Sequence, residues 1–132
     1  MATKMLELQQ KVFSVLNNSQ DLKSQVKGVF DYVPEKTVCP YVTFGHVIST
    51  PNKSKTDDGE TITVTLDIWS ESKGRKEAVT ILSTIENILE ADVELDTAFL
   101  ISQKVTNREV WEESYGLYHA TLEIEFQIEW ED

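Results

Sequence analysis

The stretch Thr61–Trp69, with the sequence TITVTLDIW, decides the fold. Isoleucine, valine and leucine take its even-numbered positions 62–68, and threonine or aspartate takes the odd-numbered positions 61–67. Strict alternation rich in β-branched side chains predicts a strand with one buried face and one polar face. We therefore expect the chain to build a sheet around this segment.

Other segments show the same alternation with varying regularity. The final stretch, Tyr118–Trp130, alternates apolar side chains such as Leu122 and Ile124 with glutamates. This pattern predicts a long strand whose outer face is acidic. Shorter strands are predicted at Val29–Val33, Tyr41–Ser49 and Phe99–Val105, and pairing of the last is expected to extend to Trp111. In Tyr41–Ser49 the residues expected to share one face are Val42, Phe44, His46 and Ile48.

Two segments have the period of an amphipathic helix. Apolar residues recur at three- and four-residue steps over residues 5–17, and again from Ala78 to Leu89. The second helix is expected to begin near Ser72 or Gly74. The predicted order is α-β-β-β-α-β-β, which favours an α+β fold: an antiparallel sheet of about five strands packed by two main helices. At 132 residues, the chain is expected to form a single domain, residues 1–132.

Two polar connections interrupt this pattern. Thr50–Glu60 is longer than the usual hairpin connection of about 2–5 residues, so we expect a long, mobile loop there. Glu112–Gly116 is expected to form a turn before the last strand.

The net charge of −11 is distributed unevenly. Residues 1–58 contain seven lysines and six acids, a net +1, whereas residues 59–132 contain five basic residues and 17 acids, a net −12. An acidic surface repels phosphate, which argues against direct binding of nucleic acid or of anionic lipid. The longest apolar run, Ala98–Ile101, is far too short for a membrane span. A reducing compartment such as the cytoplasm is the default expectation.

Few residues offer catalytic or metal-binding chemistry. His46 is expected to pack on the buried strand face, and His119 to be solvated or paired across strands. Cys39, the only cysteine, is expected to act as a small buried hydrophobe. The spacing of these three residues matches no zinc site, and no phosphate-binding glycine loop is present in the sequence. We therefore expect neither an enzyme nor a bound cofactor or metal.

Several short segments, in their order along the chain, resemble one family. They are Val29-Phe30-Asp31 with Val33-Pro34, Pro40-Tyr41-Val42 with Gly45, Asp67-Ile68-Trp69-Ser70, Gly74-Arg75 and Glu77-Ala78. In this order they resemble the tail completion and tail-to-head joining proteins of long-tailed bacteriophages, the SPP1-like family. The resemblance extends over most of the chain, from the first helix to the last strand.

This resemblance implies a small α+β virion protein without catalytic residues. Members form a ring between the head connector and the tail tube, with the hexameric symmetry of the tube. The implied partners are the head-completion or connector proteins and the tail tube protein, and the implied location is the head–tail junction, reached from the host cytoplasm. Related tail terminators cap the growing tube, so joiner and terminator both remain open.

The loop Thr50–Glu60 and the acidic region Glu109–Gly116, which includes the turn, are the two candidate interface segments. We expect them to order on contact with a partner, while the acidic charge keeps the free chain monomeric. The remaining alternatives are a small hydrolase or ligand-binding domain that uses His46 or His119, and an adaptor domain encoded by a host. Trp111 is an expected core residue or else an exposed anchor, and Trp69 and Trp130 are expected to pack. The candidate interface residues are Pro51, Lys53, Lys55, Asp57, Asp58, Trp111, Glu112, Glu113 and Tyr115.

Overall fold

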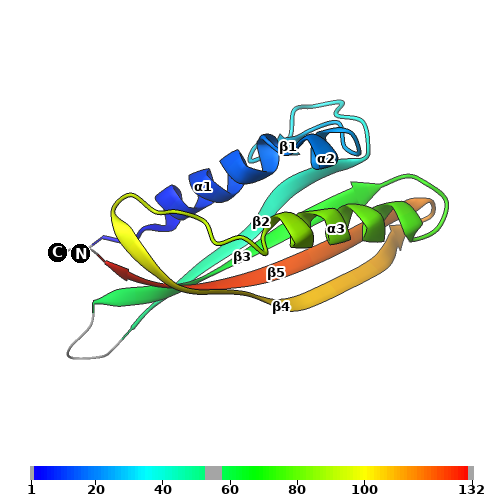
Figure 1. Ribbon diagram of the computed structural model, residues 1–132. Helices are drawn as coiled ribbons and strands as arrows, with labels where there is room; N and C mark the ends of the chain where they lie inside the picture. The colour runs from blue at the N-terminus through cyan, green and yellow to red at the C-terminus, as the bar shows by residue number, and fades with distance from the viewer. Residues whose placement is uncertain (1, 53–57, 131–132) are drawn as a thin grey trace.

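The computed structural model describes residues 2–52 and 58–130, and these residues form helices packed on a long sheet (Figure 1). Lys53, Lys55 and Asp57 lie outside the described residues. The helices are α1 (Met5–Asn17), α2 (Gln20–Lys23) and α3 (Lys76–Ile88). The strands are β1 (Val29–Phe30), β2 (Tyr41–Pro51), β3 (Gly59–Ser70), β4 (Ala98–Ser114) and β5 (Leu117–Trp130).

The strands form one sheet in the order β1-β2-β3-β5-β4. All neighbouring strands are antiparallel except β1, which is parallel to β2 and pairs with it only at Val42 and Thr43. The predicted α+β fold, with about five strands and two main helices, is therefore confirmed. The prediction did not include a parallel strand. β1 is parallel to β2 because residues 31–40 return the chain to the end of the sheet where β1 began.

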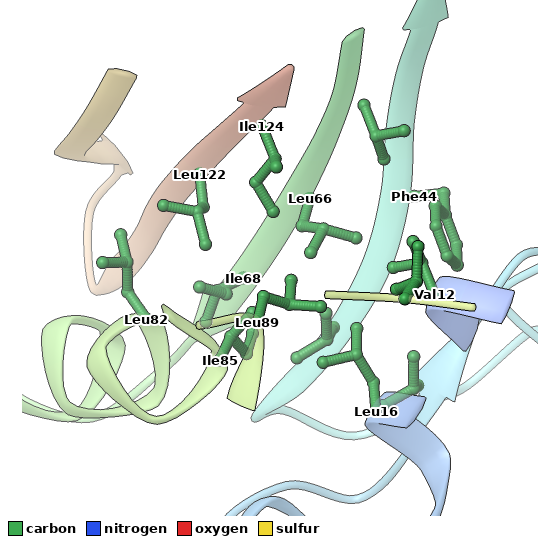
Figure 2. Close-up of a cluster of buried hydrophobic side chains, with 14 of the residues drawn as sticks. Val12, Leu16, Phe44, Leu66, Ile68, Leu82, Ile85, Leu89, Leu122 and Ile124 are labelled. Atoms are coloured by element: carbon green, nitrogen blue, oxygen red, sulfur yellow. The ribbon is translucent and has the colours of Figure 1, made fainter. Parts of the chain in front are cut away.

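The core lies between one face of the sheet and the helices α1 and α3 (Figure 2). The predicted alternation is confirmed in β3 and β5, where every second side chain from Ile62 to Ile68 and from Ala120 to Ile128 is buried. Leu8, Val12 and Leu16 pack onto this face from α1. Ala78, Ile81 and Ile85 do so from α3. Side chains at every second strand position thus pack against the apolar stripe that repeats every 3.6 residues in the helices.

The other face of the sheet, which we call the open face, carries the polar half of the alternation. No helix among the described residues covers it (Figure 1). Its central rows pair the threonines of β3 with glutamates of β5, as in Thr63 with Glu125 and Thr65 with Glu123. The prediction of an acidic outer face for the last strand therefore agrees with the observed register.

In β2 the predicted buried face is wrong beyond Phe44. An irregularity between Phe44 and Val47 inserts an extra residue into the strand, which reverses the faces of the residues that follow. Val47 therefore packs against the core, while His46 is exposed and Ile48 is 55% exposed. His46 is not the packed strand histidine that the sequence predicted.

The strands extend further than predicted at both polar connections. Pro51 pairs with Glu60, so β2 and β3 continue into the segment expected to be loop. That loop was also predicted to be mobile. Because residues 53–57 lie outside the described residues, its mobility stays a prediction. At the other connection β4 continues to Ser114, and the turn itself is confined to Tyr115 and Gly116. Gly116 has φ = +78°, a conformation that glycine adopts without strain.

The side chain of Glu60 connects four segments of the chain through hydrogen bonds, at the end of the sheet where β3 begins. Its side chain is buried, with the residue 1% exposed. Oε1 accepts hydrogen bonds from Thr3 Oγ1 and Ser49 Oγ, both at 2.5 Å. Oε2 accepts from the Lys4 amide at 2.9 Å and from Trp130 Nε1 at 2.5 Å. Burial alone raises the pKa of Glu60, but these four hydrogen bonds outweigh it and lower the pKa below its ordinary value.

We expect Glu60→Gln to destabilise the fold by about 1–3 kcal/mol, because an amide nitrogen cannot accept the two hydrogen bonds that one carboxylate oxygen accepts. Urea unfolding at neutral pH measures the loss. Glu109→Gln, at an exposed position of β4, is the control and should change stability by less than about 0.5 kcal/mol. Equal losses in the two variants would contradict this role for Glu60.

The comparison of wild type with Glu60→Gln also predicts how the stability of the fold depends on pH. Because the pKa of Glu60 is lowered by folding, its contribution is fully present above the unfolded pKa of about 4.3 and is lost as the pH falls through the folded value. The stability difference between wild type and Glu60→Gln should therefore narrow in acid. A difference that stays constant from pH 7 to pH 3 would show that the ionised carboxylate is not what stabilises this cluster.

Candidate functional site

The two candidate interface segments lie at opposite ends of the sheet. Gly59 pairs with Glu129 at one end of the β3–β5 ladder, and Ser70 pairs with Tyr118 at the other. The eleven steps from Gly59 to Ser70, at about 3.3 Å each, place these ends about 36 Å apart. We call them the hairpin end, where β2 meets β3, and the turn end, where β4 meets β5 (Figure 1).

The hairpin end presents exposed side chains on a fixed backbone. Pro51 and Asp58 are exposed. The Asn52 amide donates to the Gly59 carbonyl at 2.9 Å, and the Trp130 amide donates to the Asp58 carbonyl at the same distance. A Cβ on Gly59 would lie 2.3 Å from the Ile128 carbonyl oxygen, so this close strand approach requires glycine. The described part of the hairpin end is therefore anchored to β5.

The turn end combines a fully exposed aromatic ring with acidic side chains. Tyr115 is completely exposed at the tip, and Glu112 and Glu113 precede it at exposed positions of β4. The carboxylate of Glu112 accepts a hydrogen bond from the Gly116 amide at 3.0 Å, which fixes the turn. Tyr115 makes the turn end the more aromatic of the two candidate surfaces.

A histidine flanked by two tryptophans supports the turn end from the open face. The ring of His119 stacks on Trp69, with centroids 3.8 Å apart and planes 20° apart. On its other side lies Trp111, with centroids 4.4 Å apart. His119 Nε2 lies 2.9 Å from Asp67 Oδ1, and Trp111 Nε1 donates to the Glu113 carboxylate. The predicted cross-strand pairing of His119 is confirmed.

Trp111 is not a core residue, so that prediction is wrong, whereas Trp69 packs, as predicted, but against His119 rather than in the core. Both are half-buried on the open face, away from the helices. Trp69 follows Thr65 and Asp67 at every second position of β3, so the alternation of this strand predicts that it lies on the open face. For Trp111 no such signal existed, because irregularities in β4 after Leu100 and after Val105 change the alternation upstream of it. Trp130 does pack against the core, as predicted.

The histidines do not form a catalytic arrangement among the described residues. His46 lies level with Thr65 of β3, and His119 pairs with Trp69. Two strand spacings of about 4.8 Å and four residue steps of about 3.3 Å separate them by roughly 16 Å. No described hydroxyl or thiol hydrogen-bonds to His119, whose buried Nδ1 makes no hydrogen bond and lies 3.8 Å from Glu113 Oε2. Within the described residues, the two histidines therefore do not share a site.

Cys39 and the acidic residues add no further chemistry. Cys39 is half-buried, and burial together with Glu71 raises the pKa of its thiol to about 11, which makes it a poor nucleophile. Within residues 2–52 and 58–130, no group of three or more histidine, cysteine, aspartate or glutamate side chains is placed to hold a metal ion. The helices described here include none that is long and apolar enough to cross a membrane.

The charge asymmetry of the sequence is also seen in the fold. α1, β1 and β2 occupy one side of the sheet, and described residues 2–52 contain five lysines and four acids, a net +1. Beyond the hairpin, residues 58–130 contain five basic residues and 16 acids, a net −11. This excess is spread over β3, α3, β5 and the α3–β4 connection, whereas the edge strand β4 has two basic residues and three acids, a net −1.

Comparison with known proteins gives one family and one recurring fold. The family model described as tail completion protein gp17 matches residues 10–129. The gp17 protein of bacteriophage SPP1 superposes with a TM-score of 0.65 at 25% identity, covering 92% of this chain and 88% of that one. A chain in the virion of a native gene transfer agent particle has the same fold, with a TM-score of 0.88 at 20% identity, covering 98% of this chain and 99% of that one. No curated protein sequence matches.

The family match includes nearly all of the fold described above. It begins within α1 and ends one residue before the last residue of β5. It therefore contains every segment on which the sequence resemblance rested, from Val29-Phe30-Asp31 to Glu77-Ala78. The chain belongs to the family of the tail completion protein gp17 and is a structural protein of phage tails.

Proposed function

We propose that this protein joins the assembled tail to the DNA-filled head, at the interface between the connector and the tail tube. The observation that carries the proposal is the placement of two separate exposed surfaces at opposite ends of one sheet, about 36 Å apart. A protein that links two assemblies needs two such surfaces and a stiff body between them. Membership in the tail completion family supports the same function.

The body between the two ends is stiff because one ladder extends through it. β3 and β5 pair without a break from Gly59 to Ser70, and the side chains on their inner face pack against α1 and α3. Glu60 fixes this ladder at the hairpin end, and the stack of Trp69, His119 and Trp111 supports it near the turn end. A load at one end is therefore transmitted to the other through hydrogen bonds and close packing.

The turn end has the composition of a recognition surface. Tyrosine and tryptophan are enriched in protein interfaces, because a large ring buries much area with little loss of conformational freedom. Tyr115 provides such a ring at the tip, and the acidic side chains around it would select a partner with basic groups. We propose the connector or the tail tube as that partner.

The net charge suits a protein that must remain separate until it docks. An excess of acid makes free copies repel one another, which favours the monomer. On the particle, the copies form a ring whose symmetry follows that of the tube. The tail terminator remains the second candidate function, because the family match is to tail completion in general.

Particles produced without this chain distinguish the two functions. If the protein is a joiner, negative-stain microscopy should show DNA-filled heads and finished tails that have not joined. Abnormally long tails would instead show a terminator. Normal virions in usual numbers would contradict both functions.

Tyr115→Ala tests the turn end without altering the core. Because Tyr115 is fully exposed, its removal should change stability by less than about 0.5 kcal/mol. The yield of joined particles should fall at least tenfold if the ring is a central contact, since a tenfold change corresponds to about 1.4 kcal/mol. Tyr32→Ala, at a residue 84% exposed outside both candidate surfaces, is the matched control and should leave the yield unchanged. Equal yields from the two variants would argue against the turn end as a docking surface.

A further inference from the structure

Both edges of the sheet have outer sides that no other described segment pairs with. β1 covers β2 only at Val42 and Thr43, so residues 44–51 of β2 form a free edge. β4 forms the opposite edge over 17 residues. Within residues 2–52 and 58–130, no backbone hydrogen bond from outside the sheet reaches either of these outer edges. Unpaired strand edges are templates for pairing with another chain.

The two free edges are level with each other along the sheet. Following the register across the strands, Val47 of β2 aligns with Val64, then Ile124, and then Val105 of β4. By the same route Pro51 aligns with Leu100. The regular part of the β2 edge, residues 47–51, is therefore at the same height as residues 100–105 of β4.

The strand directions are also compatible. β2 is antiparallel to β3, β3 to β5 and β5 to β4, so β2 and β4 run in opposite directions. A second copy placed beside the first in the same orientation therefore sets its β2 antiparallel to the first copy's β4. Such head-to-tail contacts, repeated by rotation, generate a ring.

The side chains on the two edges suit the same contact. Three of the large exposed apolar residues lie on edge strands: Ile48 on β2, and Phe99 and Ile101 on β4, each more than half exposed. Residues 47–51 contain no charged side chain, and residues 100–105 contain only Lys104. Pairing these two segments therefore places no like charges opposite each other.

We propose that copies of this chain associate head to tail, with residues 47–51 of one copy pairing antiparallel with residues 100–105 of the next, so that their sheets become continuous around the ring. The proposal rests on the proposed function, which requires a ring. The occupant of each free edge is thus a second copy of the same chain.

The irregularities in the edge strands keep this pairing short. β4 is interrupted after Leu100, after Val105 and after Glu112, and β2 is interrupted after Phe44. Only four or five consecutive residues on each side are regular, since bulges disturb the ladder. A contact of this size is weak between two free copies and becomes stable when the ring closes on the end of a tail. The free monomer and the assembled ring are then compatible.

The test is cross-linking in assembled particles with Ile48→Cys and Lys104→Cys in one chain. Both residues project from the open face, where Ile48 pairs with Thr63 and Lys104 with Glu125, and the register makes them level. A short bis-maleimide, which tolerates a slip of two residues, should give a ladder of covalent oligomers larger than a dimer. Native Cys39 can remain, because its half-buried thiol has a pKa near 11, and the wild-type chain controls for it.

The controls separate the possible contacts. Particles containing a mixture of the two single variants should give dimers and nothing larger, because each copy then has one engineered thiol. A pair of Lys104→Cys with Glu109→Cys, both on β4, should give no ladder, because neither residue lies on the β2 edge. A series ending at dimers in the double variant would indicate two-fold pairing and overturn the proposal, as would monomers alone in normally joined particles. Particles that lack the chain altogether would instead overturn the proposed function.

Discussion

The β3–β5 pairing is the constraint on which the rest of the structure depends. In a strand, neighbouring side chains point to opposite faces, so a twelve-residue ladder with apolar side chains on alternate positions leaves one face to be covered. α1 and α3 cover it with their own apolar stripes. The remaining features follow from this ladder: an acidic open face, two ends about 36 Å apart, and two lateral edges on opposite sides of it.

The sequence predicted the parts of the fold that repeat a period. The strands and the two main helices were found because alternation and the helical stripe are local signals. The inserted residue between Phe44 and Val47 has no such signal, so His46 was placed on the wrong face. The cluster around Glu60 was also missed, because its donors Thr3 and Trp130 are 57 and 70 residues away along the chain. Contacts of that range are fixed by packing rather than by local pattern.

The sequence predicted the two segments of the candidate site but not their positions at opposite ends of the sheet. Sequence patterns singled out Thr50–Glu60 and Glu112–Gly116 as polar connections, whereas their separation depends on the pairing of β3 with β5. The net charge shows a similar change of meaning. Along the chain it is an imbalance between two halves, and in the fold it leaves the side formed by α1, β1 and β2 nearly neutral while the acids gather in the rest of the molecule. A tail completion protein that must remain single in solution and gather on a particle can use both properties.

Amide hydrogen exchange, compared between the free chain and assembled particles, measures both the stability of the β3–β5 ladder and the pairing of the sheet edges. We expect slow exchange in the β3–β5 ladder in both states, because its amides are paired and lie over the core. We also expect the outward-facing amides of residues 47–51 and 100–105 to exchange rapidly in the free chain and to become protected in particles. Rapid exchange within β3 and β5 of the free chain, or edge amides with the same exchange rates in both states, would contradict this arrangement.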